Sequence, residues 1–236
     1  MLTNAEIKHI RSLREKKFRD EYGEFVVEGE KMVREAAASG LQLAGRWSVD
    51  EIGESAMAKI SQLTTPSPVL AVVAKPRPKT LPEQLQHGLY LALDSVRDPG
   101  NLGTIIRIAD WFGVNTIFVS KDCVEQYNPK VVQASMGSIF RVSLIEADIP
   151  EVCRSFRAAG MPVWGMVLDG VDIYKEEFEP EGLVVMGNES VGISPAVRKE
   201  LSRGLLIPSF GESGAESLNV AVATAVTLSE FRRRSR

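Results

Sequence analysis

After a proline-rich stretch near residue 80, the chain alternates between two kinds of hydrophobic pattern. Continuous apolar runs bounded by polar turns predict buried strands at residues 89–94, 116–120, 141–145, 163–168, 183–186 and 205–207. Helical spacing with glycine, proline or capping residues at the ends predicts helices at residues 102–112, 150–159, 195–202 and 218–231, and another that starts at Asn128-Pro129. Apolar strands that alternate with helices indicate a parallel sheet covered on both faces.

Before the proline-rich stretch the pattern predicts a smaller α/β unit. Helices are expected at residues 4–13 and 31–39, and strands at residues 24–29, 46–49 and 68–74. Pro76, Pro78 and Pro82 then disfavour both helix and central strand, because proline has no backbone N–H. We therefore expect an N-terminal domain of residues 1–75, a linker of residues 76–87 and a second domain of residues 88–236.

Composition is that of an ordinary globular protein of 236 residues, with 44% hydrophobic and 25% charged residues. The apolar runs are too short to cross a membrane, and residues 1–11 lack the apolar core of a signal peptide. We therefore expect a cytoplasmic protein. With 2 Cys and 2 His, neither a disulfide framework nor a metal site is expected.

The net charge of −3 does not by itself indicate a nucleic-acid partner, but its distribution is uneven. A cationic cluster near the N-terminus contains only Glu15 as an offsetting charge; its members are Lys8, Arg11, Arg14, Lys16, Lys17 and Arg19. Such a cluster is either a solvated helix face or a surface that contacts phosphates. The arginine-rich tail, residues 232–236, is expected to be a frayed and solubilising end.

Loops that follow three of the predicted strands carry the candidate chemistry, since ligands of parallel sheets bind beyond the carboxyl ends of the strands. In the first loop, Pro99-Gly100 forces a turn and Asn101 is placed to cap the next helix. Arg107 is the only charge in the apolar run that follows, so we expect it to face a carboxylate, a phosphate or a cleft.

In the second loop, Glu189 stands between glycines that let a ligand approach the backbone. The third follows Ile207-Pro208 and leads into a helix that opens with Ser217 and Asn219. Each loop taken alone is also consistent with helix caps and an ordinary turn. The glycine spacing matches neither a Walker loop nor the dinucleotide-binding fingerprint, which argues against ATP, GTP and NAD.

Taken together and in order, the three loops resemble the motifs of the SpoU/TrmH-type RNA 2′-O-methyltransferases of the SPOUT superfamily. The matching patterns are Asn101-x-Gly103-x-x-x-Arg107, Gly187-Asn188-Glu189-x-x-Gly192 and Ser217-Leu218-Asn219-Val220. Residues 133–142 match a further family segment. Residues 10–29 are similar to the family's substrate-binding domain, whose fold resembles a ribosomal kink-turn RNA-binding protein.

The resemblance implies methyl transfer from S-adenosylmethionine to a ribose 2′-hydroxyl of RNA, with ribosomal RNA favoured over transfer RNA. It also implies a trefoil-knotted second domain and a homodimer, without metal. The catalytic candidates are Arg107, Asn101, Glu189, Ser217 and Asn219. The cofactor-binding candidates are Met186, Gly187, Asn188, Ile207, Pro208, Leu218 and Leu168. The cationic cluster Lys8, Arg11, Arg14, Lys16, Lys17 and Arg19 is the RNA-binding candidate.

Alternatives remain at this point. Arg107 could act as a general base or as an electrostatic stabiliser, and a guanidinium normally stays protonated. The segment Ser209–Glu216 is longer than is usual in the family, which leaves the cover of the cofactor open. A non-catalytic RNA-binding or ribosome-assembly protein of the same fold, or an α/β enzyme for a phosphorylated metabolite, are the competing interpretations.

Overall fold

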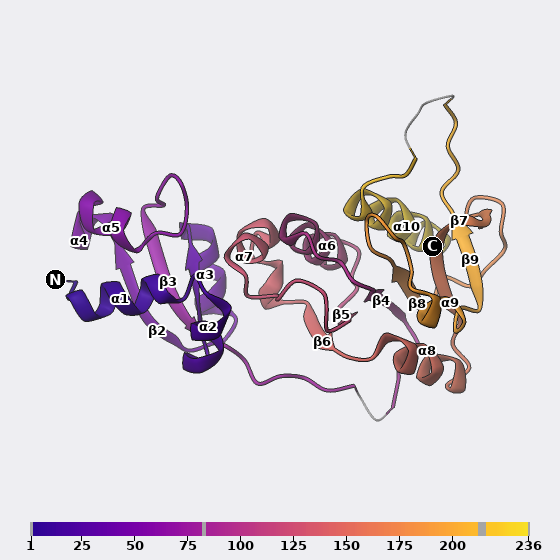
Figure 1. Cartoon of the computed structure of the whole chain (residues 1–236), viewed down its shortest axis with the longest axis horizontal. Helices are drawn as coiled ribbons and strands as arrows, with labels where there is room; N and C mark the ends of the chain where they lie inside the picture. Colours follow the sequence, from indigo (N-terminus) through magenta and orange to yellow (C-terminus); the bar gives the residue numbers. More distant parts are fainter. Residues whose placement is uncertain (1, 82–83, 212–215, 236) are drawn as a thin grey trace.

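A computed structural model describes residues 2–81, 84–211 and 216–235, and within them the residues before 75 and those after 88 form two sheets of different kinds (Figure 1). The first sheet is antiparallel with three strands in the order β1-β3-β2, and the second has six strands in the order β6-β5-β4-β8-β7-β9. All strand pairs of the second sheet are parallel. The predicted α/β class with a parallel second sheet is therefore confirmed.

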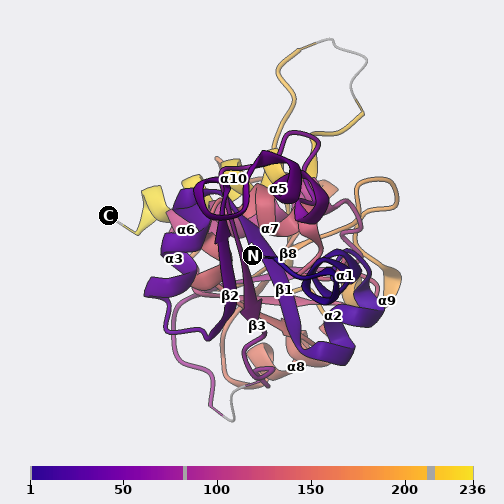
Figure 2. The same ribbon diagram turned by 90° about the vertical axis from the view of Figure 1, so that its left-hand side faces the viewer.

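The N-terminal domain surrounds the antiparallel sheet with helices, as seen end-on in Figure 2. Its elements are α1 (Asn4–Ser12), α2 (Lys16–Tyr22), β1 (Glu24–Glu28), α3 (Glu30–Ala38), β2 (Leu43–Ser48), α4 (Val49–Ile52), α5 (Glu54–Ile60) and β3 (Val69–Ala74). Alternate residues of β1 serve opposite faces of the sheet. Val26 packs with α1 and α5, whereas Phe25 and Val27 pack with α3 and with Val132 of the second domain.

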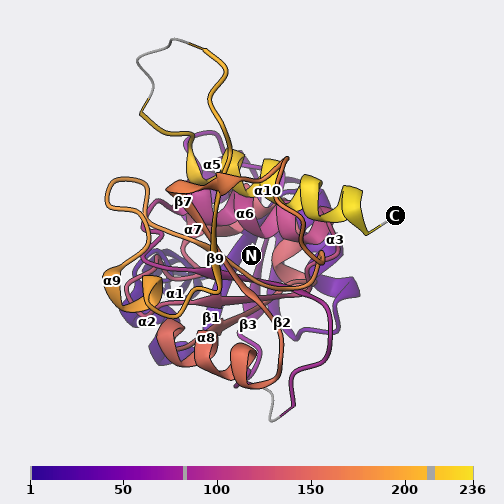
Figure 3. The ribbon, with the colours of Figure 1, turned by 90° about the vertical axis from the view of Figure 1, so that its right-hand side faces the viewer.

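The second domain places helices on both faces of its parallel sheet, and Figure 3 shows α6 and α10 on one side and α8 on the other. Its strands are β4 (Leu89–Leu93), β5 (Thr116–Val119), β6 (Ser143–Glu146), β7 (Val163–Asp172), β8 (Gly182–Met186) and β9 (Arg203–Leu206). Its helices are α6 (Pro99–Trp111), α7 (Pro129–Ser135), the 3-10 turn η1 (Ser138–Phe140), α8 (Ile149–Ala158), α9 (Pro195–Arg198) and α10 (Val220–Arg234). Two apolar cores, one on each face, hold the layers together.

Both of the helices next to the candidate loops begin at residues other than those expected. The carboxylate of Asp98 caps α6 by accepting a hydrogen bond from the backbone N–H of Asn101 at 2.8 Å. Asn219 caps α10 by accepting from Ala221 and Val222, so Ser217 is not the cap. The expected cap role of Asn101 is wrong, and its amide is thereby free for contacts outside its own helix.

Close packing between α6 and α7 explains the glycine of the first motif. A Cβ on Gly103 would lie 2.6 Å from both the Cβ of Ala134 and the carbonyl oxygen of Val131. Any larger residue would push the two helices apart. Because α7 also packs on β1 of the N-terminal domain, Gly103 helps to position that domain as well.

The two domains are further joined by buried and half-buried charges. Arg19 is only 3% exposed, and its Nη2 donates to the carboxylate of Glu125 at 2.6 Å, while its Nη1 donates to the carbonyls of Leu13 and Arg14. The expectation that Arg19 contacts RNA phosphates is therefore wrong, because its guanidinium is committed to the contact between domains. At a second junction, Arg141 pairs with Glu35 at 2.6 Å.

The arginine-rich tail also differs from its expectation, because residues 232–234 belong to the last turn of α10. The guanidinium of Arg232 donates to the carbonyls of Phe112 and Gly113, and that of Arg234 donates to the carbonyls of Ile173 and Glu176. These contacts dock the tail on the domain. No helix in the part of the chain that the structure describes is both long enough and apolar enough to cross a membrane.

Candidate active site

A cleft of about 900 Å³ lies where β4 and β8 end, and residues of all three candidate loops line it. Its lining consists of Ser95, Arg97, Asp98, Asn101, Asn188, Glu189, Ser190, Val191 and Asn219. Loops from distant parts of the sequence therefore form one surface, in the position that parallel sheets favour for ligands.

A chain of hydrogen bonds links one residue from each of the three loops. The Nδ2 of Asn219 donates to the Oδ1 of Asn101 at 2.9 Å, and the Nδ2 of Asn101 donates to the Oε1 of Glu189 at 2.8 Å. Since Asn101 accepts with one side-chain atom and donates with the other, its amide orientation is set. The half-buried carboxylate of Glu189 is thereby held at the wall of the cleft with one oxygen still available.

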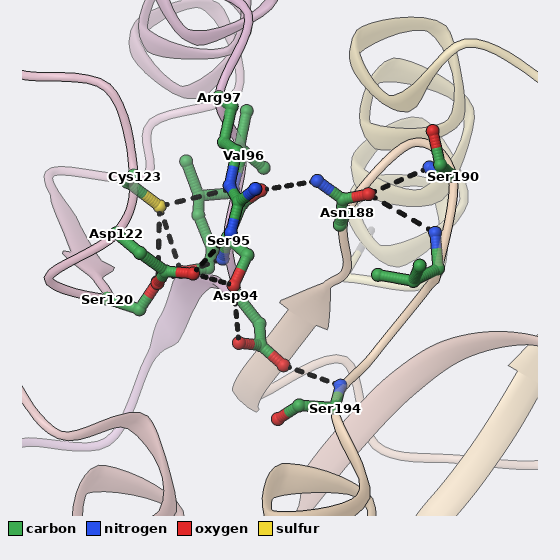
Figure 4. Close-up of polar contacts among 12 residues, drawn as sticks. Asp94, Ser95, Val96, Arg97, Ser120, Asp122, Cys123, Asn188, Ser190 and Ser194 are labelled. Atoms are coloured by element: carbon green, nitrogen blue, oxygen red, sulfur yellow. Dashed lines mark hydrogen bonds and ion pairs between the residues drawn. The ribbon is translucent and has the colours of Figure 1, made fainter.

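Asn188 builds the second loop and ties it to the first, as Figure 4 shows. Its Oδ1 accepts from the backbone N–H groups of Ser190 and Val191, and its Nδ2 donates to the carbonyl of Ser95 at 2.7 Å. A Cβ on Gly187 would lie 2.3 Å from the carbonyl carbon of Gly192, so the tight loop requires glycine there. We expect Asn188 to act on the loop's shape more than on a ligand directly.

The first loop contains a strained residue that side chains hold in place. Ser95 has φ of 64°, a left-handed conformation that costs a residue other than glycine about 1–3 kcal/mol. Its N–H donates to the Oγ of Ser120 at 2.8 Å and its hydroxyl donates to Asp122 at 2.5 Å (Figure 4). Asp122 also pairs with Arg97 at 3.3 Å. This network fixes the wall of the cleft that carries Arg97.

The pKa of Asp122 is lowered from 3.8 to about 2, first because Ser95 and then because Ser120 donates hydrogen bonds to the carboxylate, with Arg97 adding to the effect. A lowered pKa means that the folded state favours the ionised form. The stabilisation is present above pH 4 or so and is lost as the pH falls toward about 2.

We expect Asp122→Asn to melt at a lower temperature than the unaltered protein at pH 7, because the charge that holds Ser95 and Arg97 is gone. The difference in melting temperature should narrow as the pH is lowered from about 4 to about 2, where the unaltered carboxyl becomes protonated. Thermal melts of both proteins across that range check this. A constant difference would show that the carboxylate charge does not contribute.

Arg107 does not lie in the cleft. It is exposed on α6, and among residues 2–81, 84–211 and 216–235 no side chain or carbonyl forms a hydrogen bond or ion pair with it. It lies six positions after Asn101, which is about 9 Å along the helix axis. Arg107 does not pair with Glu189, whose Oε1 accepts a hydrogen bond from Asn101. One turn further along the same face is Trp111, which is 85% exposed.

Most of the cofactor candidates lie at or just after the ends of β8 and β9, and Leu168 lies within β7, the strand between those two. Met186 is the buried last residue of β8, and Ile207 and Pro208 are half-buried just after β9. Leu168 is 70% exposed where β7 breaks register between Met166 and Val171, and Leu218 is 51% exposed before α10. These candidates therefore offer apolar side chains and backbone groups near the carboxyl ends of β8 and β9. Its role in cofactor binding stays a prediction.

Ser217 is exposed, and the described residues offer its hydroxyl no hydrogen bond. The question of how the long segment Ser209–Glu216 covers a cofactor concerns residues 212–215, which lie outside the described residues. Sequence reasoning missed Asp98, Ser95 and Arg97. For Asp98 a signal was present, because aspartate followed by proline is a common start of a helix.

Comparisons with known proteins agree with this geometry. Residues 88–229 match the model of the SpoU rRNA Methylase family, and residues 4–46 match that of the MRM3-like substrate binding domain. The 23S rRNA (guanosine(2553)-2′-O)-methyltransferase RlmP of Bacillus subtilis is 29% identical to this chain, over 97% of it and 96% of its own length.

Two solved structures share the whole architecture. The AdoMet-bound rRNA methyltransferase from Sinorhizobium meliloti has a TM-score of 0.88 and 34% identity, covering 99% of this chain and 96% of that one. The SpoU methyltransferase AviRb from Streptomyces viridochromogenes, in complex with AdoMet, has a TM-score of 0.84 and 26% identity, covering 99% of this chain and 98% of its own.

Proposed function

Because the chain belongs to the SpoU rRNA methylase family, we propose that it transfers a methyl group from S-adenosylmethionine to a ribose 2′-hydroxyl of ribosomal RNA. The observation that carries this proposal is the chain of hydrogen bonds Asn219–Asn101–Glu189, which joins the three family motifs in one cleft. A transfer-RNA substrate is the alternative within the same chemistry.

The residues around the ends of β7, β8 and β9 suit S-adenosylmethionine. Met186, Leu168, Ile207 and Leu218 offer apolar contacts, and the backbone beside Gly187 and Pro208 offers hydrogen bonds without any charged side chain. When bound, the cofactor supplies a methyl group that its sulfonium already activates. The protein's remaining work is to align the acceptor hydroxyl and to help it lose its proton.

We assign the polar residues as follows. A ribose hydroxyl has a high pKa, so charge develops on its oxygen as the reaction proceeds, and a fixed cation stabilises that charge. Arg107 would provide it, as an electrostatic stabiliser rather than as a base, because a guanidinium keeps its protons. Asn101, Asn219 and Glu189 would orient the ribose, and Ser217 would contact the nucleotide or shape the pocket.

The exposed face of α6 and α10 supports a homodimer. The two helices run side by side, joined at one end by Asn219 and Asn101 and at the other by Arg232 and Phe112. Trp111 of α6 is 85% exposed, Val222 of α10 is 51% exposed, and Leu218, just before α10, is 51% exposed. A surface of this kind is typical of an interface between proteins. Arg107 lies beside Trp111, so dimerisation would bring it toward the cleft of the second copy.

Further parts of the proposal rest on the family alone. We infer that the strands β7, β8 and β9 take part in the trefoil knot of the family, which the order β4-β8-β7-β9 permits. We also infer that the N-terminal domain binds RNA like a kink-turn protein. Lys8, Arg11, Arg14, Lys16 and Lys17 are exposed there, and binding through them should weaken as salt is raised.

Calorimetry with S-adenosylmethionine separates this proposal from its rivals. We expect binding with one site per chain and no requirement for a metal ion. A protein that binds RNA but not the cofactor would be the non-catalytic relative. A protein that binds neither would leave the enzyme of a phosphorylated metabolite as the better interpretation.

A further inference from the structure

A second cleft, of about 570 Å³, lies between the two domains and meets the first one at α6. Its walls are Arg14, Gln62 and Thr64 of the N-terminal domain and Pro99, Asn128 and Lys130 of the second domain. Pro99 directly follows Asp98, which lines the candidate active site. The two clefts therefore share the first turn of α6, and a strand of nucleic acid could pass from one to the other.

A buried carboxylate builds the wall on the N-terminal side. Glu28 is only 4% exposed, and it accepts hydrogen bonds from the Oγ of Ser61 and from the backbone N–H of Gln62, both at 2.6 Å. The carbonyl of Ser61 in turn accepts a hydrogen bond from the guanidinium of Arg14. Arg14 is thus held at the cleft by a turn that Glu28 fixes.

The opposite wall comes from the loop and first turn that open α7. Asn128 caps α7 through its Oδ1, which accepts from the N–H of Lys130 at 2.9 Å. The Nζ of Lys130 and the Nδ2 of Asn128 have no hydrogen-bond or salt-bridge partner within the described ranges. Both groups are donors and both are left available.

The lining suits an anion. It contains the cations Arg14 and Lys130 and no carboxylate, whereas the first cleft contains Asp98 and Glu189. The Nε2 of Gln62 is buried behind this wall without a partner among the described residues, so a rotation of that side chain would add a further donor. Cations and neutral donors in one groove match the repeating phosphates of a nucleic-acid backbone.

We propose that this interdomain cleft holds the phosphate backbone of the nucleotides next to the one that is methylated. The proposal rests on the proposed function, which it extends by giving the RNA a path from the N-terminal domain to the first cleft. It makes Lys130, a residue of the methyltransferase domain, part of substrate binding. Contacts with phosphates place an RNA strand but do not read its sequence, so the cleft would set register rather than choose the base.

A gain of function tests the cleft most sharply, because misfolding cannot produce it. Thr64→Lys adds a cation to the lining, and Thr65→Lys adds the same charge one residue away at an exposed position outside the lining. We expect Thr64→Lys to bind its ribosomal RNA roughly threefold to tenfold more tightly at moderate salt, with a salt dependence steeper by about one ion. Thr65→Lys should change both quantities less.

The reverse change uses Lys130→Glu, with Lys199→Glu as its control, since Lys199 is an exposed lysine of the same domain that lines neither cleft. Lys130→Glu should weaken RNA binding by roughly tenfold or more and leave both the melting temperature and S-adenosylmethionine binding unchanged. The proposed role of this cleft in RNA binding would be overturned by either of two results. One is equal RNA affinity and equal salt dependence for Thr64→Lys and Thr65→Lys, and the other is unaltered RNA binding by Lys130→Glu. An unaltered protein that neither binds nor methylates RNA would overturn the proposed function itself.

Discussion

Arg107→Ala is expected to lower kcat for methyl transfer by about 10²–10³-fold, which corresponds to about 2.7–4 kcal/mol of lost transition-state stabilisation. The reason is that the residue supplies a fixed positive charge where negative charge develops on the ribose oxygen. Arg107 is exposed and takes part in no hydrogen bond or ion pair with the described residues, so its removal should leave the fold intact. Single-turnover methyl transfer with saturating cofactor measures the effect.

The controls for Arg107 separate chemistry from binding and from folding. Calorimetry should show unchanged S-adenosylmethionine binding, and the melting temperature should stay the same. Arg157→Ala removes an arginine of α8 that pairs with Glu200 and does not line the cleft, and this variant should methylate normally. Full activity of Arg107→Ala would remove this residue from the mechanism.

Mixing two inactive variants tests whether Arg107 serves the cleft of the other copy. A dimer of one Arg107→Ala chain and one Glu189→Gln chain has one site with both defects and one site with neither, if the arginine acts across the interface. Mixing should then restore part of the activity. If Arg107 serves the cleft of its own chain, each site keeps one defect and mixing restores nothing.

Trp111→Asp is expected to convert the dimer to a monomer and to abolish methyl transfer with it. An aromatic side chain at the centre of an interface typically contributes 2 kcal/mol or more, and a buried charge adds a further cost, so we expect dimer dissociation to rise at least about thirtyfold. Because the ring is 85% exposed within one chain, the fold of the monomer should not depend on it.

Analytical ultracentrifugation over a range of protein concentrations measures this change. Trp111→Phe keeps most of the apolar area and should remain a dimer, which controls for the loss of the indole alone. A Trp111→Asp protein that is still dimeric would place the interface elsewhere. An unaltered protein that is monomeric at every concentration would contradict the proposed dimer.

The sequence predicted the parallel sheet well because its central strands β4 and β8 are buried on both faces and therefore appear as continuous apolar runs. It predicted the N-terminal domain less completely. Helix α2 is short and mostly charged, with Phe18 and Tyr22 as its only apolar pair, and α5 is also short. In the sequence, the buried Arg19 of α2 cannot be told apart from the other members of the cationic cluster. Its partner Glu125 lies far away along the chain, so the sequence does not reveal that the two residues form an ion pair.

Three of the catalytic candidates line one cleft, but Arg107 and Ser217 do not, and the hydrogen bonds among the three were not predicted. Asn101, Glu189 and Asn219 were expected together because each follows the end of a parallel strand. Which of them would contact which depended on the cap of α6, and Asp98 took that role and left the amide of Asn101 for Glu189. Arg107 was expected to face a carboxylate, a phosphate or a cleft because it interrupts an apolar run. The run instead packs α6 on the sheet through its other residues, which leaves Arg107 outward beside Trp111.

Methyl transfer to a ribose 2′-hydroxyl can be measured by the resistance of the labelled RNA to alkali. The protein is incubated with tritiated S-adenosylmethionine and ribosomal RNA that has not been modified, and the RNA is then hydrolysed in alkali. A methylated 2′-hydroxyl can no longer attack the neighbouring phosphate. If the protein methylates ribose, the label is therefore recovered in dinucleotides that resist the alkali. Label in mononucleotides would mean that a base is methylated, and no label in any RNA fraction would mean that the protein does not catalyse this reaction.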